Sequence, residues 1–236
     1  MEREPLSTSV NNRDSLRALE ERLGDVRSRI AAAARRAGRD PAGVRLVAVT
    51  KQVGPETIQA AAAAGIEEFG ENYVKDLETK RLAAPDATWH FIGRLQSNKV
   101  RRVLQAADVI QTLEPGKAAD KLLESTAELE ERRRFLIEVD FTRSRVGSAP
   151  EELDRFADLV ANSGVRLEGL MTVAPQDEDP RPTFARLREL RDGLVDRHQE
   201  ATHLSMGMSA DLEVAVEEGA TMVRVGTGIF GPRARR

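Results

Sequence analysis

Lys51 is a lysine that directly follows an apolar segment of this 236-residue chain, VRLVAVT at positions 44–50. Only six of the 36 basic residues are lysines, so few side chains can supply a reactive amine. An amine at the end of a buried strand is partly desolvated, and a neutral amine can condense with an aldehyde to form a Schiff base. A lysine in this place can also extend its ammonium group into solvent. Spacing alone favours that second interpretation.

Two glycine-containing segments near the C-terminus have residue types that bind phosphate. SMGMS (205–209) precedes an amphipathic helical pattern, and Ser209 is placed to cap that helix. Gly226-Thr227-Gly228 follows a short apolar segment. Hydroxyls and free backbone N–H groups at helix starts bind anions. Each segment alone is also explained as a turn or a cap, but together they favour a phosphate site.

A phosphate site beside a reactive amine matches pyridoxal 5′-phosphate, because this cofactor carries both a phosphate and an aldehyde. Arg224 lies between the two segments within an apolar pattern, MVRV (222–225). If its side chain points inward, it could bind either the phosphate or the pyridine nitrogen. If it points outward, it would pair with a carboxylate on a helix. The sequence leaves these possibilities open.

Short β-branched strands alternate with amphipathic helices along the chain. Strands are expected at 44–51, 66–70, 88–93, 108–113, 134–140, 165–173, 202–207 and 221–228. Helices are expected at 14–37, 56–65, 72–83, 97–107, 116–133, 150–164, 181–198 and 210–219. Strict alternation indicates parallel strands joined by right-handed crossovers.

Eight such units favour an α/β fold, a (β/α)8 TIM-type barrel with an extra N-terminal helix. An open doubly wound sheet is the alternative, but TKQVGPE (50–56) after the first strand has no G-x-G-x-x-G phosphate loop. We expect one domain over 1–236, with flexible ends at 1–13 and 232–236. Barrel sites form at the carboxyl ends of the strands. This rule brings Lys51, Asn72, Met171 and both C-terminal segments to one face.

Several motifs resemble those of the pyridoxal phosphate homeostasis proteins, single-domain relatives of the N-terminal barrel of bacterial alanine racemase. The motifs are LVAVTK (46–51), FGENYV (69–74), WHFIGRLQSNK (89–99), GLMTV (169–173) and SMGMSADLEVAVEEGATMVRVGTGIFG (205–231). The resemblance covers roughly Asp14 to Gly231 and implies Lys51 as the Schiff-base lysine. It also implies a cofactor pocket formed by Asn72, Ser205, Met206, Gly207, Arg224, Gly226 and Thr227. The strand-end positions add Met171 and Ser209 to this pocket.

One loop departs from the pattern of these relatives. After the fifth strand they commonly carry a lysine two residues before a glycine, whereas this chain has Arg145 in TRSRVGS (142–148). Arginine does not form an imine, so the departure puts any second lysine site there in doubt. Lys75 and Lys99 could accept an aldehyde weakly, but they are better explained as solvated helix lysines.

The resemblance implies a protein that holds the cofactor for pyridoxal phosphate homeostasis without efficient catalysis. Racemisation normally uses two bases, and in alanine racemase the second base is a tyrosine from a further domain. The single tyrosine of this chain, Tyr73, is expected to begin a helix, so it does not correspond to that second base. A weak racemase-like enzyme is the alternative, and a cofactor-free phosphosugar enzyme is a third hypothesis. His90, His198 and His203 have no metal-ligand spacing, so we expect no metal site.

Composition restricts the remaining classes. A net charge of −3 and a pI of about 5.8 argue against nucleic-acid binding through bulk charge. No apolar run approaches the ~20 residues of a membrane span, and the first residues lack a secretory signal. The chain has no cysteine, which excludes disulfides and thiolate sites. We expect a cytoplasmic monomer that binds a small-molecule cofactor and makes transient contacts with pyridoxal-phosphate-dependent enzymes.

Overall fold

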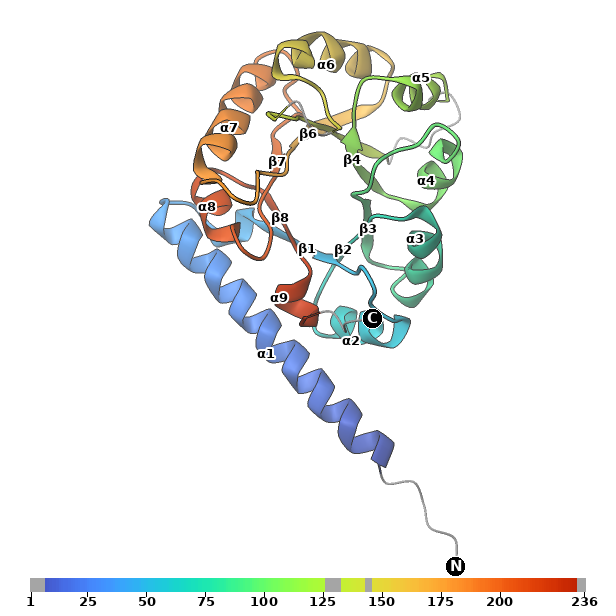
Figure 1. Cartoon of the computed structure of the whole chain (residues 1–236), viewed down its shortest axis with the longest axis vertical. Helices are drawn as coiled ribbons and strands as arrows, with labels where there is room; N and C mark the ends of the chain where they lie inside the picture. The colour runs from blue at the N-terminus through green and yellow to red at the C-terminus, as the bar shows by residue number, and fades with distance from the viewer. Residues whose placement is uncertain (1–6, 126–132, 143–145, 233–236) are drawn as a thin grey trace, which may run out of the picture.

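The computed structural model describes residues 7–125, 133–142 and 146–232, with side chains described from Ser15 onward. Eight parallel strands form a closed barrel in chain order, and β8 pairs with β1 to close it (Figure 1). The strands are β1 (Arg45–Val49), β2 (Glu68–Glu71), β3 (Thr88–Phe91), β4 (Val109–Leu113), β5 (Arg134–Glu138), β6 (Arg166–Met171), β7 (His203–Ser205) and β8 (Met222–Val225). The predicted (β/α)8 TIM-type fold is confirmed.

Helices surround the barrel on its outer side (Figure 1). They are α1 (Ser7–Arg36), α2 (Pro55–Ala63), α3 (Val74–Lys80), α4 (Val100–Ala106), α5 (Lys117–Glu124), α6 (Leu153–Asn162), α7 (Arg181–Val195), α8 (Leu212–Glu217) and α9 (Thr227–Phe230). Short 3-10 turns lie at Pro41–Gly43, Arg81–Ala83 and Pro150–Glu152. Within the described ranges, no helix combines the length and the apolar character that a bilayer crossing requires.

Most predicted boundaries shift by at least one residue in the structure, and the helix expected at 116–133 is described as a helix only over Lys117–Glu124. The strand expected at 221–228 ends at Val225, because the carbonyl of Gly226 accepts hydrogen bonds from the N–H groups of Ile229 and Phe230 and so begins helix α9. The helix expected at 210–219 is confined to Leu212–Glu217, and the first helix begins at Ser7 instead of residue 14.

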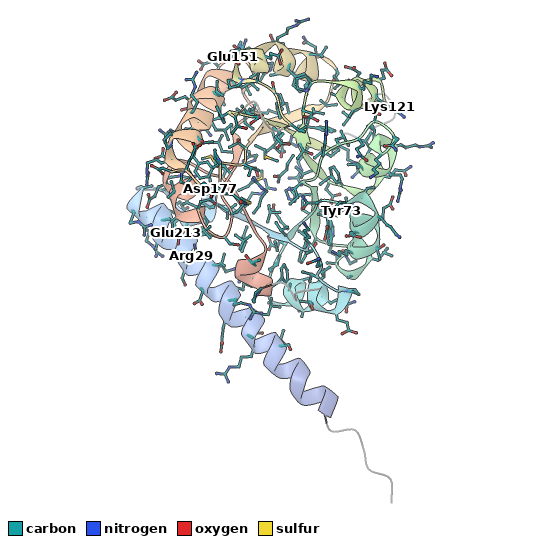
Figure 2. The ribbon with its side chains drawn as sticks, in the orientation of Figure 1. Arg29, Tyr73, Lys121, Glu151, Asp177 and Glu213 are labelled. Atoms are coloured by element: carbon teal, nitrogen blue, oxygen red, sulfur yellow. The ribbon has the colours of Figure 1, made fainter. Side chains whose placement is uncertain are left out.

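Helix α1 lies against α8 and α9, beside the seam where β8 meets β1 (Figure 1). Its buried side chains recur every three or four residues: Leu19, Leu23, Val26, Ile30, Ala33 and Ala34. Because α9 has only four residues, α1 supplies most of the apolar cover that the eighth helix of the barrel would otherwise give. Arg29 of α1 also donates to both carboxylate oxygens of Glu213 in α8, at 2.6 and 2.8 Å (Figure 2).

The barrel interior holds a small apolar cluster made of Val47, Val109, Leu136, Met171 and Met222. These side chains come from five different strands, so they can meet only inside the barrel. A larger cluster fills the space between the strands and the surrounding helices. The interior is therefore closed below the mouth, which leaves the carboxyl ends of the strands as the place for a site.

Candidate functional site

Lys51 lies just beyond the end of β1. The N–H of Thr50 donates to the carbonyl of Gly70 at 3.0 Å, which extends the pairing with β2 by one residue, and Lys51 follows as a partly buried side chain. Gln52 has a φ of 64°, a left-handed conformation that costs a non-glycine residue roughly 1–2 kcal/mol. Other contacts must therefore hold the chain in place around Lys51.

A buried ion pair between Glu71 and Lys80 supplies those contacts. The carboxylate Oε1 of Glu71 accepts hydrogen bonds from the Thr50 hydroxyl at 2.6 Å and from the Lys80 ammonium at 2.5 Å. Lys80 also donates to the backbone carbonyl of Thr50 at 2.6 Å. The pair thus fixes both the side chain and the carbonyl of the residue before Lys51. Sequence reasoning missed these residues, because IEEFGE (66–71) carries three glutamates and nothing local marks Glu71 as the fully buried one.

Asn72, another predicted site residue, is tied to the same carboxylate. Its backbone N–H donates to Oε2 of Glu71 at 3.2 Å, and its side chain is partly exposed just beyond β2. The structure therefore places Lys51 and Asn72 at the ends of neighbouring strands that share one buried anchor.

Arg224 points into the barrel, which excludes the outward orientation. Its Nη1 donates to the Ser205 hydroxyl at 2.7 Å, and its Nη2 donates to the Thr172 carbonyl at 2.8 Å. Burial is the main influence on the pKa of Arg224 and lowers it to about 10, against the opposing attraction of Glu138 and Asp211. The side chain is therefore still a cation at neutral pH, and only two of the five N–H donors of its guanidinium take part in these two bonds.

Ser205 has a different environment from the one expected of a phosphate-binding loop. It is the last residue of β7, and its side chain is fully buried inside the barrel. Its hydroxyl accepts from Arg224 and donates to Oε1 of Gln111 at 2.6 Å. A direct bond from this hydroxyl to a phosphate would require breaking the bond to Gln111, so we assign Ser205 to the support of Arg224.

Ser209 does not cap helix α8, so the predicted capping role is wrong. Residues 208–211 form a turn in which Asp211 accepts a hydrogen bond from the N–H of Met208, and α8 begins only at Leu212. The Ser209 hydroxyl instead accepts from the N–H of Gly228 at 3.2 Å and lies 3.3 Å from the Thr227 hydroxyl. The two predicted phosphate segments are thereby brought together.

The two methionines among the predicted site residues have fully or nearly fully buried side chains. Met206 belongs to the apolar layer between strands and helices, and Met171 belongs to the cluster inside the barrel. The backbone N–H of Met206 is also used, because it donates to the carbonyl of Met222 at 3.1 Å. These positions support the walls of the site and do not offer polar groups to a ligand.

Gly207→Ala is expected to lower the free energy of unfolding by about 1–3 kcal/mol. Gly207 has a φ of 90°, and an added Cβ would lie 2.4 Å from the Cβ of Ala215. Gly193→Ala in α7 is the matched control, because no atom lies within 4 Å of its added Cβ; it should raise stability by about 0.5–1 kcal/mol. Urea unfolding followed by circular dichroism measures both changes. Equal effects at the two positions would contradict a special role of the Gly207 turn.

The other residues singled out in the sequence are Arg145 and the three histidines. Arg145 lies outside the described residues. His90 contacts Glu68 and Gln111, His198 contacts Asp158, and His203 contacts Thr221, so the three histidines are separate from one another. Across the part of the chain that the structure describes, no three His, Cys, Asp or Glu side chains gather in a way that could hold a metal ion.

The chain is similar over most of its length to known proteins. Residues 22–234 match the family model of the alanine racemase N-terminal domain. The pyridoxal phosphate homeostasis protein of Aquifex aeolicus is 41% identical over 222 residues, covering 90% of this chain and 97% of that protein. The protein of the same name from Pseudomonas aeruginosa is 39% identical over 227 residues, covering 90% and 95%. The structure of PipY from Synechococcus elongatus with PLP bound superposes with a TM-score of 0.79 at 33% identity, covering 90% of this chain and 100% of that one.

Proposed function

Because this chain belongs to the pyridoxal phosphate homeostasis proteins of the alanine racemase N-terminal domain family, we propose that it holds pyridoxal 5′-phosphate as a Schiff base on Lys51. Its role in the cell is then to keep the reactive aldehyde bound and to balance the supply of the cofactor. The observation that carries the proposal is the placement of a lysine, a buried arginine and two hydroxyls at the ends of β1, β8 and β7, which are neighbours in the barrel.

The donor set fits the three polar parts of the cofactor. Lys51 offers an amine for the aldehyde. Ser209 and Thr227 offer hydroxyls where the loops after β7 and β8 meet, and a phosphate would bind there. Arg224 can donate only, and the phosphate oxygens and the pyridine nitrogen are both acceptors. The geometry therefore supports Arg224 as a contact to one of these two groups.

A cationic Arg224 placed at the pyridine nitrogen would favour holding the cofactor over turnover. When bound, the cofactor supplies an electron sink for carbanion chemistry, and that sink is strongest with a protonated pyridine nitrogen. If Arg224 faces this nitrogen, its donors keep the nitrogen unprotonated and weaken the sink. The names of the relatives, which refer to homeostasis, point in the same direction.

The proposal is tested by the absorption spectrum of the purified protein during titration with pyridoxal phosphate. We expect a new band at the edge of the visible range, and borohydride reduction followed by peptide mass mapping should place the adduct on Lys51. A spectrum equal to the sum of free cofactor and protein would contradict binding as an imine.

An amino-acid assay separates a carrier from an enzyme. The loaded protein is incubated with L-alanine and with other L-amino acids, and the D-isomers are measured. We expect no formation at ordinary enzyme rates. Turnover of ~1 s⁻¹ or faster would support the racemase-like alternative instead.

A further inference from the structure

A chain of polar side chains crosses the barrel interior below the proposed cofactor site. It starts at Arg224 of β8 and continues through Ser205 of β7 to Gln111 of β4. Nε2 of Gln111 lies 2.8 Å from Nδ1 of His90 in β3, and Nε2 of His90 lies 2.9 Å from Oε2 of Glu68 in β2. Ser205, Gln111 and His90 are fully buried, so water does not replace these bonds.

The chemistry at the two ends fixes the direction of every bond in this chain. A guanidinium only donates, so the Ser205 hydroxyl must accept from Arg224 and use its single O–H to donate a hydrogen bond to Oε1 of Gln111. The amide nitrogen of Gln111 then faces His90, whose Nδ1 must accept. His90 consequently carries its proton on Nε2 and donates it to Glu68, which accepts only.

Electrostatics at the far end agrees with this assignment. Arg45 of β1 donates to both oxygens of Glu68, at 2.6 and 3.0 Å. Burial would raise the pKa of Glu68, but the hydrogen bonds from His90 and Arg45 outweigh it and lower the pKa to about 2. Burial lowers the pKa of His90, against the opposing hydrogen bond to Glu68. At neutral pH Glu68 is therefore an anion and His90 is neutral, as the direction of the chain requires.

We propose that Gln111, His90 and Glu68 are positioning residues for Arg224. By accepting a hydrogen bond from Ser205, Gln111 keeps an oxygen lone pair of Ser205 facing the guanidinium. His90 and Glu68 keep the Gln111 amide in the orientation that allows this. This fixes the remaining donors of Arg224 for the bound molecule. The inference rests on the proposed function, because Arg224 acts on a ligand only if the cofactor binds at the mouth.

Gln111→Met tests the positioning role, since methionine keeps a similar volume but neither accepts from Ser205 nor donates to His90. We expect the dissociation constant of pyridoxal phosphate to rise about five- to tenfold, measured from the absorption titration. Thr112→Val is the matched control on the same strand, because it removes a buried bond from the Thr112 hydroxyl to the Gly93 carbonyl without touching the chain. It should leave the dissociation constant unchanged. An unchanged constant for Gln111→Met, or an equal rise for Thr112→Val, would overturn the inference.

Nitrogen-15 NMR of the unmodified protein provides a second measurement that needs no variant. Without cofactor, long-range nitrogen–proton correlations should show His90 as the neutral Nε2–H tautomer, and cofactor addition should shift its ring nitrogen signals. An Nδ1–H tautomer, or signals that do not move while the imine band forms, would overturn the inference. Failure of the proposed function is distinguishable, because the imine band would then be missing although the His90 tautomer is as expected; the positioning role would fall with it.

Discussion

Replacing Lys51 with alanine is expected to abolish the imine band while the barrel stays folded. Lys51 is the proposed site of the covalent bond, and no hydroxyl or guanidinium at the mouth can replace an amine in that reaction. The side chain lies beyond the end of β1 and is only partly buried, so its loss removes little packing. Absorption spectra with pyridoxal phosphate measure the band, and circular dichroism checks the fold.

Two further lysines and one conservative change serve as controls. Lys51→Arg keeps the positive charge but cannot form an imine, so it should lose the band like the alanine variant. Lys75→Ala and Lys99→Ala remove the other lysines that sequence reasoning placed near the mouth, and both should keep it. A band that survives in Lys51→Ala would show that the lysine assignment is wrong, and its loss in Lys75→Ala or Lys99→Ala would place the imine on that lysine instead.

Replacing Lys80 with methionine is expected to lower the free energy of unfolding by about 3–5 kcal/mol, because it leaves an uncompensated charge in the protein interior. The Glu71 side chain is fully buried, and without Lys80 its carboxylate would stay buried but lose its cationic partner. The Thr50 carbonyl would lose a donor at the same time. Urea unfolding of the protein without cofactor, followed by circular dichroism, measures the change.

The double variant Lys80→Met with Glu71→Gln distinguishes an unpaired charge from lost packing. Neutralising Glu71 removes the buried charge, so the double variant should be more stable than Lys80→Met alone. Lys121→Met, at an exposed position of α5, should change stability by less than about 0.5 kcal/mol. A Lys80→Met variant as stable as Lys121→Met would contradict the importance of the ion pair for the turn before Lys51.

The sequence by itself determined the order and type of the elements. Buried parallel strands are continuously apolar and amphipathic helices repeat every three or four residues, so both are visible in a local window. Eight alternating units led to a closed barrel, and the rule that barrel sites form at the carboxyl ends of strands selected Lys51 and the two C-terminal segments. Element ends were less well predicted, as at Gly226 and Ser209, where backbone hydrogen bonds of turns decide the boundary.

Only the tertiary structure decided which polar side chains meet. The bond between Ser205 and Gln111 joins residues 94 positions apart, and the contact of Lys80 with Thr50 joins residues 30 positions apart. Such contacts depend on the register between strands and on how the barrel closes, and a local hydrophobic pattern carries no information on either. For the same reason the inward direction of Arg224 could not be chosen from the sequence, since a buried β-strand is apolar on both of its faces.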